Sequence, residues 1–150
     1  MELTSTAFEE GTSIPVEYTC DGPDVSPPLS WSGVPRDARS MVLIVDDPDA
    51  PAGTWVHWVL ADLDPSTSNL PEGVAADPHP DVGGVHGEND FGNLGYGGPC
   101  PPGEEHRYFF RLYALEGPLD LEPGVRRAEV DRAMEGRILE QCRLMGRYER

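Results

Sequence analysis

The stretch Ser40-Met-Val-Leu-Ile-Val-Asp46 is a short, unbroken run of apolar and β-branched residues. Such a run, with no polar alternation, predicts a strand that is buried on both faces. Two further segments, at residues 54–61 and 107–115, are rich in aromatic and β-branched side chains, and the arginines of the second fall on one side only. A shorter strand is expected at 29–32. Short strands joined by turns predict an antiparallel β-rich domain, most simply a sandwich.

Glycine and proline, which favour turns, occur throughout the chain and are not concentrated in a linker between domains. The 17 glycines and 16 prolines are spread over all 150 residues, so we expect one domain spanning residues 1–150. One helix is predicted at 128–145, where apolar residues recur at steps of four and three and Gly146 takes the place of a C-terminal cap. The apolar stripe of this helix consists of Val130, Met134, Ile138, Cys142 and Met145.

The charge balance is strongly acidic. The chain has 27 Asp and Glu residues against 11 basic residues, every one of them arginine, so its formal net charge is −16. Proteins that bind nucleic acid or anionic membranes need a basic face, so neither partner is expected. Carboxylates in excess without lysine favour adaptation to high salt, which screens their mutual repulsion. With no secretory signal and no apolar run of membrane-spanning length, we expect a cytoplasmic protein without membrane insertion.

The three cysteines do not form a recognisable pattern. Cys20, Cys100 and Cys142 fit neither a disulfide scaffold nor a CxxC metal or redox pair. In a protein expected in the cytoplasm, reduced structural thiols are the favoured interpretation. A bridge between Cys20 and Cys100 is left open.

A stiff acidic turn, Asp47-Pro-Asp-Ala-Pro51, follows the first buried strand. Its prolines hold the backbone out of a helix, so the turn aims both aspartates. His57 lies in the next strand, where alternation predicts that Trp55 and Val59 share its face. Buried imidazole nitrogens need partners, and Asp47 is the partner we expect for His57. Turn-forming aspartates and a structural core histidine are the alternative interpretation.

A glycine-rich stretch precedes the third apolar strand. Glycines at 92, 95, 97 and 98 allow backbone N–H groups to converge, which predicts an anion-binding nest. Neither a dinucleotide fingerprint nor a phosphate-binding P-loop fits, because prolines follow Gly98 and the chain has no lysine. Beyond the prolines, alternation places His106 and Tyr108 on the same face as Phe110 and Leu112.

Together these motifs resemble the phosphatidylethanolamine-binding protein family, and most closely its prokaryotic Raf kinase inhibitor-like branch. The resemblance extends over the whole chain and is carried by Asp47-Pro-Asp-Ala-Pro51, Trp55-x-His57, Gly95-Tyr-x-Gly98-Pro99 and His106-Arg107-Tyr108. It implies a Greek-key antiparallel β-sandwich with short helices and a C-terminal helix. It also implies a small cavity at one end of the sandwich for a phosphate, acetate or phosphoethanolamine-like group. The residues implied to line that cavity are Asp47, His57, Gly98, Pro99, His106 and Tyr108, with Trp55 and Pro51 as wall residues.

The expected function is non-enzymatic binding of small phosphorylated or carboxylate anions, with a regulatory role left open. The donors would be two imidazoles, a phenol hydroxyl and the Gly98 N–H. The aspartate would accept a hydrogen bond from a histidine and raise its pKa, or accept one from the ligand itself. Affinity should rise as pH falls through the histidine range. We expect no metal and no cofactor.

Other functions remain open at this stage. One is a metal-dependent hydrolase built from Asp47, Asp49, His57 and His106. Another is that this chain is a protein inhibitor of a kinase or protease, which rests on the family resemblance alone. A homodimer through an exposed sheet edge is also left open. His79 and His86, in a loop, are expected to be exposed and outside the site.

Overall fold

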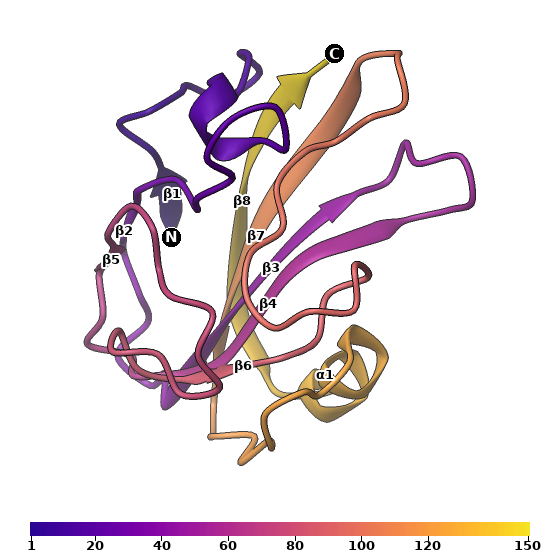
Figure 1. Ribbon diagram of the computed structural model, residues 1–150. Helices are drawn as coiled ribbons and strands as arrows, with labels where there is room; N and C mark the ends of the chain where they lie inside the picture. The colour runs from indigo at the N-terminus through magenta and orange to yellow at the C-terminus, as the bar shows by residue number, and fades with distance from the viewer.

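The computed structural model describes all residues from Met1 to Arg150. It consists of two antiparallel β-sheets and two short helices (Figure 1). The larger sheet has the order β6–β4–β3–β7–β8, with these strands at Val85–His86, Trp55–Leu63, Ser40–Asp47, His106–Leu115 and Ile138–Tyr148. The smaller sheet has the order β1–β2–β5, at Glu2–Thr4, Leu29–Ser32 and Asn69–Leu70. A 3₁₀ turn, η1, covers Val16–Tyr18 and the helix α1 covers Arg127–Met134. Neither is long and apolar enough to cross a membrane.

The two sheets face each other across the main hydrophobic core. Leu3 and Trp31 of the smaller sheet belong to the same buried cluster as Leu43 and Phe110 of the larger one. A second cluster lies on the other face of the larger sheet, where Val130 of α1 packs against it. Strand β3 contributes side chains to both clusters, and all of its residues are buried. The position of β3 between the two clusters explains why its sequence is a continuous apolar run, and the predicted burial on both faces is confirmed.

The larger sheet is connected as a Greek key. Strand β4 pairs with β3 on one side and with β6 on the other. Strand β7 then returns to pair with the free edge of β3. This is the spatial order that defines the motif. The Greek-key sandwich predicted from the sequence is confirmed, and the four predicted strands are present as β2, β3, β4 and β7. The connection brings the end of β3 and the starts of β4 and β7 to one end of the sandwich.

A β-bulge in β4 sets the direction of His57. Consecutive residues of β3 pair with Val56 and with Trp58, which leaves His57 as an extra residue between two pairs. Val56 and Val59 both pack in the cluster beneath α1, whereas His57 contacts Tyr108, which belongs to the core between the sheets. The prediction that His57 and Val59 share a face is wrong, because the bulge interrupts the alternation.

The C-terminal segment is a short helix followed by a long strand. The helix α1 ends at Met134, and β8 then runs antiparallel to β7 from Ile138 to Tyr148. A helix near the C-terminus was predicted and is present, but its predicted extent of 128–145 is wrong beyond Met134.

The apolar spacing that predicted the longer helix also fits a strand. Steps of four match a helical face and are at the same time multiples of the two-residue strand period. Met134, at the end of α1, packs in the cluster between the helix and the larger sheet, while Cys142 packs from β8 against the core between the sheets. Gly136, with φ of 75°, adopts the left-handed conformation just after the helix. Gly136 therefore supplies the terminating glycine that was predicted at Gly146.

Candidate functional site

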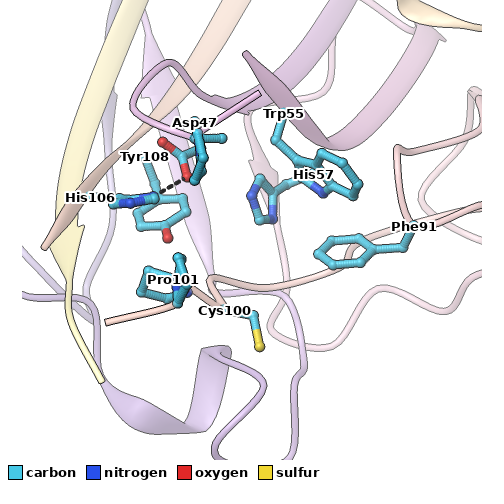
Figure 2. Close-up of a pocket in the computed structure, with 11 residues that line it drawn as sticks. Asp47, Trp55, His57, Phe91, Cys100, Pro101, His106 and Tyr108 are labelled. Atoms are coloured by element: carbon cyan, nitrogen blue, oxygen red, sulfur yellow. Dashed lines mark hydrogen bonds and ion pairs between the residues drawn. The ribbon is translucent and has the colours of Figure 1, made fainter. Parts of the chain in front are cut away.

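A cavity of about 180 Å³ lies at the end of the sandwich where β3 ends and β4 and β7 begin. Figure 2 shows its polar side chains grouped between aromatic and proline walls. It is lined by Asp47, Ala50, Pro51, Trp55, His57, Phe91, Cys100, Pro101, Pro102, His106 and Tyr108. The structure thus brings six of the eight predicted site residues together, and Gly98 and Pro99 are the two that do not line the cavity.

Asp47 is paired with His106. The Nδ1 atom of His106 lies 2.7 Å from the Asp47 Oδ2 atom, and both side chains are buried (Figure 2). The other carboxylate oxygen of Asp47 accepts the backbone N–H of Asp49 at 2.8 Å. Since Nδ1 is occupied by this carboxylate, Nε2 is the nitrogen of His106 that remains for a ligand. The prediction that Asp47 pairs with a histidine holds, but the partner is His106 and not His57.

His57 is held by the backbone of the glycine-rich loop. Its Nδ1 atom lies 2.6 Å from the carbonyl oxygen of Gly97, which can only accept, so Nδ1 carries the proton. Burial lowers the pKa of His57, and the Gly97 carbonyl and the Asp47 charge offset this only in part. The ring is therefore neutral at pH 7, and its Nε2 atom presents a lone pair. The edges of Tyr108 and Phe91 confine the ring, with centroids 5.2 Å and 5.3 Å away.

Tyr108 supplies a hydroxyl that stays protonated. Its side chain is 1% exposed, and burial together with the charge of Asp47 raises its pKa far above the usual value. In Figure 2 the hydroxyl points toward Pro101, on the far wall of the cavity. The ring lies nearly parallel to that of His106, with centroids 6.5 Å apart. Tyr108 can therefore donate a hydrogen bond at any pH near neutrality.

The glycine-rich loop anchors the site and does not form the predicted anion-binding nest. The N–H of Gly98 donates to the Asp24 carboxylate at 2.8 Å, and the N–H of Gly97 donates to the carbonyl of His57 at 2.9 Å. A Cβ atom at Gly98 would overlap the Tyr18 carbonyl oxygen and the Asp24 side chain. The glycine is therefore needed for close backbone approach, and its N–H is not available to a ligand.

A disulfide bond joins the loop to the segment after η1. Cys20 and Cys100 are bridged, with Cα atoms 5.4 Å apart, so the expectation of three reduced thiols is wrong for this pair. Cys142 is free and half-buried. The N–H of Cys20 donates to the Pro99 carbonyl beside the bridge. Cys100 then carries the chain into the proline wall of the cavity.

Asp49 does not line the cavity. The guanidinium of Arg107 donates to both of its oxygens, at 2.9 Å and 2.8 Å, and lowers the pKa of Asp49 to about 2. The four residues of the hydrolase alternative are therefore not gathered in one site. More generally, no group of three or more His, Cys, Asp or Glu side chains is arranged to hold a metal ion.

The two remaining histidines, His79 and His86, differ in their exposure to solvent. His79 is exposed, as predicted. His86 is fully buried: its Nε2 atom accepts the indole N–H of Trp58 at 3.0 Å, and its Nδ1 atom lies 2.7 Å from the Asp77 carbonyl. The prediction that His86 is exposed is wrong, because the short strand β6 carries it into the sheet.

Part of the apolar wall of the cavity was not predicted, namely Phe91, Pro101 and Pro102. Phe91 packs edge-on against Trp55 and His57, and its side chain is 43% exposed. Pro101 and Pro102 line the cavity next to the disulfide-linked Cys100. A lone aromatic residue inside a glycine-rich loop and a proline pair after it were the available signals, since neither suits an ordinary flexible loop.

The match to a known family spans nearly the whole chain. The family model for phosphatidylethanolamine-binding protein matches residues 4–149. A UPF0098 protein of Methanothermobacter thermautotrophicus is 54% identical over 150 residues, covering 100% of this chain and 99% of that protein. A UPF0098 protein of Aquifex aeolicus is 48% identical over 154 residues, covering 100% of this chain and 89% of that protein.

Two solved structures share the fold. A homologue of phosphatidylethanolamine-binding protein from Chlamydia trachomatis has a TM-score of 0.91 at 46% identity, covering 99% of this chain and 96% of its own. Escherichia coli YbcL, described as a new member of the mammalian PEBP family, has a TM-score of 0.92 at 30% identity, covering 99% and 98%. On sequence and on structure alike, this chain belongs to the phosphatidylethanolamine-binding protein family.

Proposed function

We propose that this chain binds small phosphate- or carboxylate-type anions in the cavity at the end of the sandwich, without transforming them. The observation that carries the proposal is that the imidazoles of His57 and His106 and the hydroxyl of Tyr108 line one cavity of about 180 Å³. Protonated imidazoles and a phenol are strong donors to oxyanions. A cavity of this size suits a head group better than a whole lipid.

The protonation of His57 governs binding. Because its pKa is lowered by burial, Nε2 accepts a hydrogen bond at neutral pH, and a bare anion has nothing to donate. The ligand must therefore bring a proton, or the imidazole must take one up on binding. Phosphate monoesters have a second pKa of about 6, so their protonated form is available in that range. A monoester dianion that is protonated on binding, or an imidazole that is, takes up a proton, so affinity for such a ligand rises as pH falls.

The Asp47 carboxylate is compatible with an anion in the same cavity. Its two oxygens are occupied by His106 Nδ1 and by the backbone N–H of Asp49. Because Asp47 holds the Nδ1 atom, the Nε2 atom of His106 is the one presented to the ligand. Asp47 therefore acts by orienting His106, as a carboxylate behind a histidine does in many binding sites.

The lining supports binding in preference to covalent chemistry. No serine, threonine or lysine lines the cavity, and the sulfur of Cys100 is held in a disulfide. The polar side chains that remain, those of Asp47, His57, His106 and Tyr108, can donate, accept or carry protons.

Isothermal titration with inorganic phosphate tests the proposal. In His106→Asn the amide nitrogen can still serve Asp47, but the cavity-facing Nε2 is lost. We expect affinity to fall about tenfold or more, as for the loss of a hydrogen bond to a charged group. His79→Asn, an exposed histidine outside the cavity, should bind as the wild type does. Wild-type protein that does not bind phosphate, or equal losses in both variants, would overturn the proposal.

A further inference from the structure

One face of the larger sheet carries a group of arginines that the anion site does not use. This arginine strip consists of Arg107, Phe109 and Arg111 on β7 and Arg143, Met145 and Arg147 on β8. The register places the six directly opposite one another, as the pairs Arg107–Arg147, Phe109–Met145 and Arg111–Arg143. Residues directly opposite in an antiparallel pair share a face, so four of the 11 arginines of the chain gather in one small area.

The strip runs against the usual preference for cross-strand pairs. Like charges directly opposite each other destabilise a sheet, and two Arg–Arg pairs occur here in a chain with few arginines. The guanidinium groups lie over the ring of Phe109, with Arg111 at 4.7 Å, Arg143 at 5.0 Å and Arg107 at 5.5 Å from its centroid. Stacking on the ring offsets part of the repulsion and limits the side chains to few conformations.

No element of the fold covers the strip. The helix α1 covers the same face of β7 farther along, where Tyr113 and Leu115 pack with Val130. In Figure 1, α1 lies near the start of β8, at the end of the sheet away from the C-terminus. Phe109 is nevertheless only 6% exposed. The arginine side chains cover its ring in place of a helix or loop.

The charge of the strip is only partly neutralised from within the chain. Three of its arginines have carboxylate partners, in the pairs Arg107–Asp49, Arg147–Glu105 and Arg111–Asp46. Arg143 is exposed and makes no hydrogen bond or ion pair, although the chain has 27 acidic residues. An open cavity of about 330 Å³ lies beside it, with Arg111 and Arg143 among its lining residues.

We propose that the arginine strip is a docking surface for an acidic polypeptide segment of a partner protein. A carboxylate that enters the cavity beside Arg143 meets a guanidinium that has no partner and that the Phe109 ring has already positioned. Guanidinium and carboxylate can pair through two parallel hydrogen bonds. Arginine, methionine and aromatic residues are also the types enriched at protein interfaces and among their strongest contacts.

Nucleic acid suits this surface less well. A nucleic-acid-binding protein neutralises several phosphates at once, whereas the strip offers one arginine without a carboxylate partner in a molecule of net charge −16. An acidic peptide needs only one or two carboxylate contacts together with apolar contact to Met145. The global charge repels such a peptide, so any binding must come from a local site.

The test is fluorescence polarisation with a labelled peptide of alternating Glu and Val, at ~0.15 M salt. Wild-type protein should bind it and should bind the matching Gln–Val peptide much more weakly. Arg143→Gln should lose affinity about tenfold, since one well-placed contact is worth this much at an interface. The matched control is Arg36→Gln, which removes an exposed arginine outside the strip and should change nothing. Thermal melts of both variants exclude a folding defect.

The outcomes separate this site from the anion pocket. Saturation with inorganic phosphate should leave peptide binding unchanged, because the two sites share no lining residue. Absence of peptide binding, equal binding of the Gln–Val peptide, or equal losses in Arg143→Gln and Arg36→Gln would overturn the proposal. It would also be overturned if the chain alone self-associated in an Arg143-dependent way, because the occupant would then be a second copy.

Discussion

His57 and His106 line one cavity, and each directs its Nδ1 atom at an oxygen, but the two oxygens differ in charge. The Nδ1 atom of His106 faces a carboxylate, whereas that of His57 faces a carbonyl. Burial lowers the pKa of His57, and the Gly97 carbonyl offsets this only in part. His57 therefore resists protonation in the free protein, and this has a measurable consequence for stability.

We expect the free protein to lose stability as pH falls through the histidine range. The folded-state pKa of His57 is lowered from its ordinary value of 6.5. The unfolded chain then takes up a proton at a higher pH than the folded chain does, so the free energy of unfolding decreases as pH falls below about 6.5 and levels off below the folded-state pKa. Thermal melts of wild type and His57→Asn without phosphate, between pH ~8 and ~5, check this over the range of histidine titration.

His57→Asn keeps a donor for the Gly97 carbonyl and should lose less stability on acidification than the wild type. The buried His86, whose pKa is also lowered, is present in both proteins and cancels in the comparison. An identical acid-induced fall in melting temperature for the two proteins would contradict the assignment.

At this scale the sequence predicted residue types better than partners. Asp47, His57, His106 and Tyr108 were expected in one cavity, and the structure brings them together. Which histidine Asp47 binds could not be derived, because the answer depends on a bulge that reorients His57. The N–H of Gly98 was expected to serve the ligand, but a carboxylate 74 residues away in sequence accepts it.

Among the elements, the loop at residues 96–102 does most to fix the cavity wall. It is linked to residues 18–24 by the disulfide, by the Tyr96 hydroxyl, which donates to the Tyr18 carbonyl at 2.6 Å, and by the Gly98 N–H, which donates to Asp24. None of these three links could be derived from the sequence, since each joins residues far apart in the chain. The C-terminal strand β8 was missed for a different reason, because its apolar spacing matches the helical and the strand period alike.

The disulfide should contribute strongly to stability. Cys20 and Cys100 are 80 residues apart, and cross-linking a loop of that length restricts the unfolded chain by about 4 to 5 kcal/mol in the chain-entropy account. We expect Cys100→Ser to lose a large part of this in urea unfolding, with a lower midpoint. Cys142→Ser, which removes the free cysteine, is the control and should cost far less. If dithiothreitol left the wild-type midpoint unchanged, the bridge would have no such role.

Over the whole molecule, the net charge of −16 reflects the acidic residues of the surface. Ligand recognition depends instead on the side chains of each local site. The cavity contains no lysine or arginine and relies on groups that become donors when protonated. Four of the few arginines are instead concentrated on one sheet face. A strongly acidic total therefore coexists with two sites suited to anionic groups, a combination that net charge alone would have excluded.

Salt should stabilise the protein by screening this charge. The Debye length falls from ~10 Å at 0.1 M to ~3 Å at 1 M, so repulsion between separated carboxylates is largely removed over that range. We expect the melting temperature at neutral pH to rise with sodium chloride, and to rise much less as the pH approaches the isoelectric point of about 4.4. A salt effect of equal size at both pH values would indicate a cause other than charge screening.

The anion site is tested most directly by proton-linked binding of phosphoethanolamine, a phosphate monoester whose dianion has no phosphate proton to donate. Isothermal titration in two buffers of different ionisation enthalpy, from pH ~8 down to ~5, measures both affinity and proton uptake across the range of histidine titration. Binding through His57 and His106 predicts affinity that rises as pH falls, with net uptake of protons that is reduced in His57→Asn. Affinity that does not change with pH, or binding without proton uptake, would contradict it.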